Sequence, residues 1–216
     1  MSADCLISVQ RTSTATDYLP EEYLPSFMDL VVWGHEHECL INPRKNPEQG
    51  FQVIQPGSSV ATSLMPGEAV EKHVTILNIT GKEFTDEPIR LRTVRPFVMR
   101  EIVLRDEPGM DELAHKENNR AQITRHLEFI VWNMISEAKQ QWNEAQEDDS
   151  GEDEREMPKP LIRLRVDYSA PEGGRFDLEN PQRFSKRFAN AVANTNDVVQ
   201  FHKKKTAASE SPLSQS

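Results

Sequence analysis

Two histidines separated by one residue follow a short apolar run near the start of the chain. The run Val31-Val32-Trp33 ends at Gly34, and His35 and His37 come directly after it. An apolar run of this length is typical of a buried strand, and ligands gather where such strands end at the edge of a sheet. Imidazole nitrogens bind manganese, iron or zinc. The spacing therefore predicts a metal site at His35 and His37.

Two histidines at this spacing are a short pattern, and the alternative is a pair of ordinary surface side chains. The preceding strand favours the metal site, and so does the segment 55–59 that ends the next strand. Its small residues and backbone N–H groups could lie close to a phosphate, although such a segment is also compatible with a plain turn. Two metal ions roughly 3.5–4 Å apart can bind a phosphodiester and activate a water molecule. Phosphodiester hydrolysis is therefore the chemistry that these residues indicate.

Short strands, each closed by glycine or proline, are predicted to position this site. Alternating or continuous apolar patterns predict strands at residues 29–33, 51–55, 73–79, 89–94, 97–104 and 161–168. Apolar residues that recur at helical spacing predict a helix over residues 111–145 and a second one over 181–192. The first sixteen residues are polar and show no pattern. Strands in series with two helices indicate an α/β protein with a β-rich layered part.

The composition excludes several classes of protein. Cys5 and Cys39 are too few and too far apart for a disulfide framework, which favours a reducing compartment. No apolar run approaches the length of a membrane helix, so we expect no membrane partner. The acidic segment 144–158 is predicted to be a flexible loop, and residues 206–216 a disordered tail. The formal net charge of -10 argues against a generic nucleic-acid binder, but the basic residues are concentrated in local segments.

Seven segments carry a resemblance to a known family. Residues 29–39, 55–60, 66–70, 93–97, 161–169, 183–188 and 192–194, in that order, closely resemble the eukaryotic double-strand-break repair nucleases. These enzymes are members of the calcineurin-like metallophosphoesterases, and the likeness covers roughly residues 14–205. It implies that residues 1–95 form the C-terminal part of a layered metallophosphoesterase β-sandwich. Residues 96–205 would then form a small α+β cap domain that binds DNA.

The resemblance also implies a role for the two histidines. His35 and His37 would each ligate a different manganese ion in a nuclear endonuclease and exonuclease of homologous recombination and meiosis. The family's other ligands precede this motif, and no histidine precedes His35 here. Two imidazoles cannot hold a two-ion centre alone, so we expect an incomplete site and no hydrolysis by this chain by itself. A truncated nuclease is the favoured explanation, and a short form that only binds DNA is the alternative.

Basic residues in the implied cap and at its junction agree with DNA binding. Arg163 and Arg165 share one face of the predicted strand 161–168, because alternate side chains of a strand point the same way. Such a row can contact phosphates at regular spacing, which positions a duplex without reading its sequence. The alternative for each residue is a solvated surface side chain. The predicted contacts to duplex DNA are Arg90, Arg92, Arg95, Arg163, Arg165, Lys186 and Arg187.

The resemblance implies two protein partners for the family, an SMC-like ATPase and nibrin. The regions that bind them lie beyond the cap and upstream in the phosphoesterase domain, so we expect both contacts to be largely absent here. A different phosphoesterase, such as a protein phosphatase, is a third hypothesis. The arginine-rich segment after Pro96 has no evident use on small phosphoesters, which disfavours it.

Overall fold

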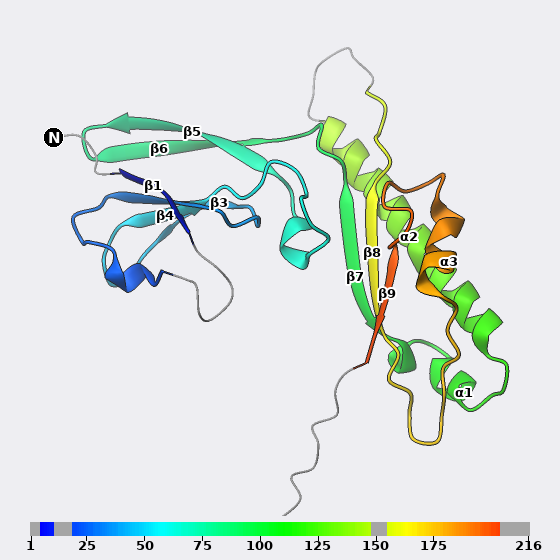
Figure 1. Ribbon diagram of the computed structural model, residues 1–216. Helices are drawn as coiled ribbons and strands as arrows, with labels where there is room; N and C mark the ends of the chain where they lie inside the picture. The colour runs from blue at the N-terminus through cyan, green and yellow to red at the C-terminus, as the bar shows by residue number, and fades with distance from the viewer. Residues whose placement is uncertain (1–4, 11–18, 148–154, 204–216) are drawn as a thin grey trace, which may run out of the picture. The chain divides into compact units, whose positions relative to one another are not determined.

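The computed structural model describes residues 5–10, 19–147 and 155–203 of the chain (Figure 1). The chain divides into two compact units. The first unit combines Met1–Met99 with Ile135–Leu161, and the second combines Arg100–Met134 with Ile162–Ser216. Strand β7 (Phe97–Val103) and helix α2 (Arg120–Glu147) run through both units. The mixture of several sheets and few helices confirms the predicted α/β class. The division into domains near residue 95 stays a prediction.

A four-stranded sheet in the first unit carries the histidine motif. Its order is β1 (Cys5–Gln10), β2 (Leu30–Gly34), β4 (Gln52–Gln55) and β3 (Leu40–Lys45). β2 is parallel to both β1 and β4, whereas β3 is antiparallel to β4. β1 corrects the expectation that the first sixteen residues lack a pattern. β3 was not predicted either, because Pro43 interrupts its sequence; proline is tolerated there since β3 is an edge strand.

β2 is buried on both faces, which explains its continuous apolar sequence. Val31 and Trp33 pack on one side in a cluster with Leu24, Phe51 and Val53. On the other side, a second cluster is formed by Leu30, Ile41 and Ile54. The buried strand fixes the position of the loop that follows it.

A hairpin covers the second of these clusters. β5 (His73–Thr80) and β6 (Glu83–Arg90) pair antiparallel along their whole length. The turn between them contains Gly81 with φ +65°, a conformation that tight hairpin turns require and glycine adopts without strain. Leu77 and Phe84 project from the hairpin onto the cluster. The strand predicted at residues 89–94 is therefore wrong, because β6 ends at Arg90.

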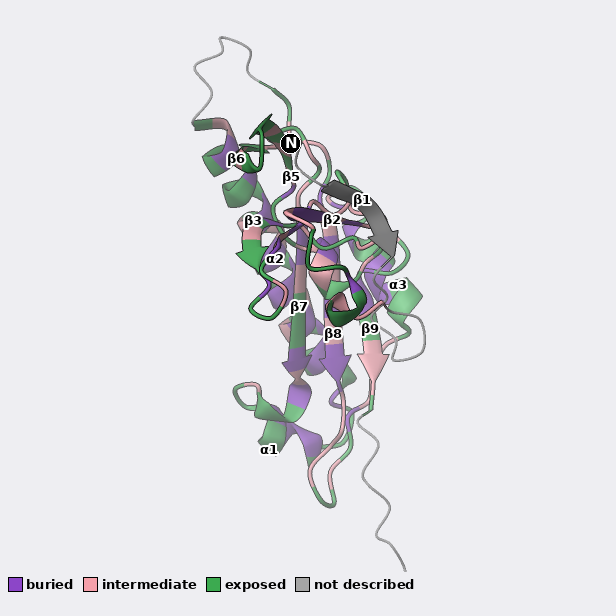
Figure 2. Ribbon diagram, turned by 90° about the vertical axis from the view of Figure 1, so that its left-hand side faces the viewer, coloured by how far each residue is buried: buried purple, intermediate pink, exposed green. Residues whose placement is uncertain are grey.

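A three-stranded sheet has the order β7, β8 (Leu161–Asp167) and β9 (Val199–His202), with β8 and β9 parallel. In β8, Ile162, Leu164 and Val166 are fully buried, in agreement with the predicted alternation. Buried residues follow β8 and one side of α2 in Figure 2. The shorter elements are η1 (Glu21–Tyr23), η2 (Pro66–Glu68), η3 (Leu104–Asp106), α1 (Met110–Ala114), α3 (Pro181–Ser185) and η4 (Lys186–Phe188).

The long helix predicted over residues 111–145 is interrupted, and this prediction was wrong in its first part. α1 ends at Ala114 and α2 begins at Arg120. Between them Asn118 adopts φ +56°, a left-handed conformation that asparagine tolerates. The side-chain amide of Asn119 donates to the carbonyl oxygens of Leu113 and Arg175 over 3.0 and 2.8 Å. Such side-chain bonds to the main chain compete with continuation of a helix.

Two further expectations need correction. The helix predicted over residues 181–192 is only α3, followed by the 3-10 turn η4. The acidic segment begins inside a helix, because α2 continues to Glu147. Residues 148–154 of the predicted loop and the predicted tail at 206–216 lie outside the described residues. No helix in the described part of the chain is long and apolar enough to cross a bilayer.

Candidate functional site

The two histidines lie on the loop that begins where β2 ends. His35 has φ +67°, a backbone conformation that residues other than glycine rarely adopt, and the N–H of Glu36 donates to the carbonyl of Gly34 over 2.8 Å. Both imidazoles are exposed, and the side chain of His37 retains 53% of its accessible surface. This location, at the C-terminal end of a buried parallel strand, agrees with the one inferred from the sequence. Metal binding at this loop stays a prediction.

Main-chain contacts fix the loop at His37 and Glu38. The carbonyl oxygen of His37 accepts from the backbone N–H of Ser58 over 3.1 Å and from Nζ of Lys72 over 3.2 Å. The amide of Gln55 donates to the carbonyl of Glu38 over 3.1 Å. The backbone N–H groups of the segment 55–59 were considered as phosphate donors, with a plain turn as the alternative, and that of Ser58 is used inside the protein. The segment 55–59 therefore serves as a support for the histidine loop.

Gly57 permits the close approach of these two loops. It adopts φ +71°, and a Cβ atom at this position would lie 2.6 Å from the carbonyl oxygen of Glu38 and 2.7 Å from that of His37. Real Cβ atoms essentially never approach main-chain atoms so closely. Only glycine combines this conformation with this close approach.

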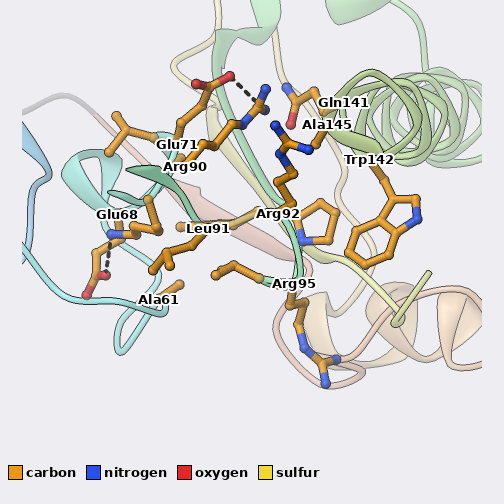
Figure 3. A pocket seen from close by; sticks show the side chains of 16 residues that line it. Ala61, Glu68, Glu71, Arg90, Leu91, Arg92, Arg95, Gln141, Trp142 and Ala145 are labelled. Carbon is orange, nitrogen blue, oxygen red and sulfur yellow. Dashed lines mark hydrogen bonds and ion pairs between the residues drawn. The ribbon is translucent and has the colours of Figure 1, made fainter. Parts of the chain in front are cut away.

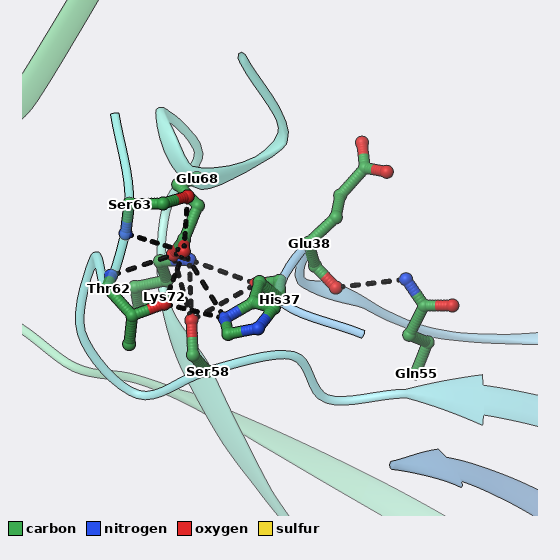
Figure 4. Close-up of polar contacts among 8 residues, drawn as sticks. All are labelled: His37, Glu38, Gln55, Ser58, Thr62, Ser63, Glu68 and Lys72. Carbon is green, nitrogen blue, oxygen red and sulfur yellow. Dashed lines mark hydrogen bonds and ion pairs between the residues drawn. The ribbon is translucent and has the colours of Figure 1, made fainter. Parts of the chain in front are cut away.

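A buried carboxylate, that of Glu68, connects the loop to its surroundings (Figure 4). The side chain is 2% exposed. Its Oε1 atom accepts from the hydroxyl of Thr62 over 2.6 Å and from the backbone N–H groups of Thr62 and Ser63 over 3.2 and 3.1 Å. Its Oε2 atom accepts from the hydroxyl of Ser58 over 2.9 Å and from Nζ of Lys72 over 3.3 Å. Both oxygens of this carboxylate thus face several donors.

These donors determine the charge of Glu68. Burial by itself would raise the pKa of a carboxyl group, because it penalises the charged form. The hydrogen bonds from Thr62, Ser58 and Lys72 outweigh that penalty and lower the pKa of Glu68 to about 2. The carboxylate is consequently ionised and forms a buried ion pair with Lys72.

Glu68 also lies beside His37. Its Oε1 atom is 3.3 Å from Nδ1 of the imidazole, and Oγ1 of Thr62 is 2.6 Å from the same nitrogen. No pattern in the sequence indicated a role for Glu68, Thr62 or Lys72. The four-residue spacing of Glu68 and Lys72 is compatible with an ion pair, but it does not reveal that both side chains are buried.

The donor chemistry of the two histidines fits a part of a manganese site. Imidazole nitrogen is a suitable ligand for this metal, and both rings are exposed at one loop. Within residues 5–10, 19–147 and 155–203, no cluster of three or more histidine, cysteine, aspartate or glutamate side chains could hold a metal ion. His35 and His37 could therefore supply two ligands of a larger coordination shell.

Three of the predicted DNA contacts gather in the first unit. Arg90, Arg92 and Arg95 line a pocket of about 170 Å³ (Figure 3). Arg90 forms an ion pair of 2.7 Å with Glu71 at the rim. Arg95 is exposed and donates to the carbonyl oxygen of Lys159 over 2.7 Å. The structure thus brings these three arginines together.

Arg163 and Arg165 lie on the face of β8 opposite its buried residues, as the alternation predicted. Nη2 of Arg163 lies 3.2 Å from Oδ2 of Asp197, and Nη1 of Arg165 lies 3.2 Å from Oε2 of Glu101. Nε of Arg163 is buried and has no hydrogen-bond partner in the described structure. The row of two arginines therefore exists, with a carboxylate beside each guanidinium.

Lys186 and Arg187 follow α3. Lys186 is exposed on η4. Arg187 donates to Glu179 over 2.8 and 3.0 Å and to Glu128 over 2.6 Å, and the hydrogen bonds that the Glu179 carboxylate accepts raise the pKa of the Arg187 guanidinium. Arg187 is thus more fully neutralised than the two arginines of β8. The seven predicted basic residues divide between the two units, and their contact with DNA stays a prediction.

The chain is similar to a described protein family and to several curated proteins. Residues 84–216 match the family described as the Mre11 DNA-binding presumed domain. The chain is 60% identical over 190 residues to the double-strand break repair protein mus-23 of Neurospora crassa, an alignment that covers 88% of this chain and 26% of the relative. It is 45% identical over 191 residues to the double-strand break repair protein MRE11 of Mus musculus, covering 86% and 24% respectively. The chain therefore spans about a quarter of the length of these curated relatives.

Proposed function

The chain belongs to the Mre11 family of double-strand break repair proteins, and from this premise we propose that it binds duplex DNA in a nuclear nuclease that processes broken ends. Its relatives are DNA repair proteins, and residues 84–216 carry the family's DNA-binding domain. The repair processes in which we propose that the protein acts are homologous recombination and meiosis. The finer fold proposal is a C-terminal part of a metallophosphoesterase β-sandwich followed by a cap.

The observation that carries the proposal is the arginine row on β8. A guanidinium group binds phosphate oxygens through paired hydrogen bonds, and two arginines on one strand face match a repeating phosphate backbone. Both side chains are paired with carboxylates, those of Asp197 and Glu101. Exposed ion pairs contribute only about 0.2–1 kcal/mol each, so DNA phosphates can replace these partners.

The second part of the proposal concerns the metal. His35 and His37 would each ligate one of two manganese ions, which when bound would polarise the phosphodiester and activate a water molecule. Within the chain, the hydrogen bonds from Ser58 and Lys72 hold the main chain at His37 in place. Two imidazoles cannot hold a two-ion centre by themselves, and no cluster of three or more candidate ligand side chains occurs among the described residues, so we expect no hydrolysis by this chain alone. Binding of an SMC-like ATPase and nibrin is proposed for the whole protein rather than for these residues.

Duplex binding by the purified chain tests the first part. Fluorescence anisotropy with two labelled duplexes of unrelated sequence, at several salt concentrations, should give equal affinities. The logarithm of the binding constant should fall linearly with the logarithm of the salt concentration, because bound arginines release counterions. Salt-independent binding, or no binding at low salt, would overturn the proposed DNA role.

Manganese-dependent cleavage tests the second part. The same chain, incubated with labelled duplex and Mn²⁺, should leave the DNA intact, and His37→Ala should behave in the same way. If the chain cleaves DNA and His37→Ala abolishes the cleavage, the incomplete site is refuted and the chain is a nuclease in its own right. If duplex binding is retained without cleavage, the chain acts as a DNA-binding module.

A further inference from the structure

The contacts of His37 determine which of its two ring nitrogens is available to a ligand. A neutral imidazole carries one proton, either on Nδ1 or on Nε2, and the nitrogen without the proton offers the lone pair. Nδ1 of His37 faces two oxygens, Oγ1 of Thr62 at 2.6 Å and Oε1 of Glu68 at 3.3 Å. The direction of these hydrogen bonds therefore fixes the tautomer.

The Oε1 atom of Glu68 can only accept. It receives backbone N–H groups from Thr62 and Ser63 over 3.2 and 3.1 Å, and a backbone N–H group cannot act as an acceptor. The other oxygen of the same carboxylate receives the ammonium group of Lys72. Because Oε1 of Glu68 can only accept, the hydroxyl of Thr62, which lies 2.6 Å away, must donate its hydrogen to this oxygen.

Because the Thr62 hydroxyl gives its single hydrogen to Glu68, it has none left to donate to His37. A hydroxyl group has one hydrogen and two lone pairs, so Oγ1 of Thr62 must accept in its second hydrogen bond. Nδ1 of His37 then faces two acceptors at once and has to supply the hydrogen (Figure 4). We infer that Thr62 and Glu68 are positioning residues that hold His37 in the Nδ1–H tautomer and turn the lone pair of Nε2 outward.

The tautomer specifies which nitrogen of His37 would bind a metal, and the choice of manganese as that metal rests on the proposed function. Many metal-binding histidines donate a hydrogen bond from one ring nitrogen to a carboxylate, directly or through an intervening group such as the Thr62 hydroxyl. This hydrogen bond fixes the orientation of the ring and raises the basicity of the other nitrogen, which binds the metal. The 53% exposure of the His37 side chain leaves its outer edge accessible to a ligand. Nε2 is therefore the atom of His37 that would reach the ion.

Nitrogen-15 NMR on the full chain without added metal tests the tautomer directly. Long-range proton–nitrogen correlations at mildly alkaline pH distinguish Nδ1–H from Nε2–H, and His37→Ala assigns the signal. We expect the Nδ1–H pattern for His37. Thr62→Val keeps the shape of the side chain but removes the relay oxygen, so it should lower the Nδ1–H population. Ser63→Ala is the matched control, because Ser63 also donates to Glu68 but makes no hydrogen bond with His37.

The outcomes separate this inference from the proposed function. An Nε2–H pattern in the unmodified chain would overturn the inference, and a Thr62→Val variant with an intact amide spectrum and an unchanged tautomer would overturn its claim that Thr62 is a positioning residue. Titration with Mn²⁺ then examines the metal role, and Thr62→Val should weaken Mn²⁺ affinity by about 10-fold or more, the effect typical of removing a group that orients a metal ligand. If the tautomer is as inferred but Mn²⁺ leaves the His37 signals unchanged, the positioning role stands and the proposed metal role fails.

Discussion

Nη1 of Arg165 donates to Oε2 of Glu101 over 3.2 Å, and the other oxygen of Glu101 lies 3.4 Å from Nε2 of His202. Glu101 on β7 thus supplies negative charge beside the arginine row of β8. In free protein this carboxylate holds the guanidinium in place, whereas in a complex with DNA it would oppose the phosphates. We therefore expect Glu101 to weaken duplex binding.

Glu101→Gln should therefore strengthen duplex binding by about 2- to 5-fold at low salt, in keeping with the modest energy of an exposed ion pair. The gain should shrink as salt is raised, because screening weakens interactions between exposed charges. Anisotropy titrations at low and moderate salt measure both effects. Glu117→Gln is the matched control, since it removes the same charge from an exposed position in the same unit. Equal gains in the two variants would mean that only the net charge matters.

The double variant Arg163→Ala, Arg165→Ala should weaken binding to all duplex sequences. The slope of the logarithm of affinity against the logarithm of salt concentration should fall by about 1 to 2 units, roughly one for each phosphate that the variant no longer binds. Salt titrations with two unrelated duplexes measure this.

Arg187→Ala provides the comparison for this double variant. Arg187 is bound by Glu179 and Glu128, so its removal should affect stability more than DNA binding. Ion pairs of this exposure contribute about 0.2–1 kcal/mol each, and the melting temperature should fall accordingly. If Arg187→Ala reduces the salt slope as much as the double variant, the β8 face has no special role.

Gly57→Ala should destabilise the first unit and displace the histidine loop. The new Cβ atom would overlap the carbonyl groups of His37 and Glu38 in addition to forcing an unfavourable positive φ. We expect a decrease of about 2–4 kcal/mol in the free energy of unfolding, measured by urea denaturation. Gly50→Ala is the control, because Gly50 also has a positive φ, +85°, but open space around its Cβ position. Its decrease should be limited to about 1 kcal/mol of backbone strain, and an equal decrease in both variants would contradict the steric explanation.

The ionised state of Glu68 predicts a dependence of stability on pH. The pKa of Glu68 is about 2 in the folded chain against 4.5 for an ordinary glutamate, so folding favours the charged form. The resulting stabilisation is fully present above pH 4.5 and is lost as the pH falls toward 2. It amounts to at most about 3 kcal/mol at neutral pH. The carboxyl carbon-13 shift of Glu68 should show a midpoint well below that of an exposed residue such as Glu117, and an ordinary midpoint would refute the buried network.

Glu68→Gln should correspondingly flatten the acid limb of the stability curve. The difference in unfolding free energy between the two proteins should be largest near neutral pH and should shrink between pH 4.5 and the acid limit. Urea denaturation over this pH range measures it. A difference that stays constant with pH would assign the effect to altered packing rather than to charge.

The local sequence pattern was sufficient to predict those elements whose structure depends on residues close together in the chain. The apolar run of β2 and the alternation of β8 predicted both strands, because the period of side chains along a strand is a local property. The same reasoning failed between α1 and α2. Residues 115–119 are all polar and were predicted to continue one helix, but the side chain of Asn119 bonds to Arg175 and Asp177 far along the chain. Such distant partners leave no local signal.

Residue order alone was enough to predict the α/β class, the position of His35 and His37 after a buried strand, and the arginine pair on one face of β8. Each of these follows from residue types at fixed spacing within one segment. Residue order did not reveal that Glu68 is buried, that it contacts His37 together with Thr62, or that carboxylates neutralise Arg165 and Arg187. These relationships join loops and strands that are separated in sequence, and they exist only once the sheets have packed.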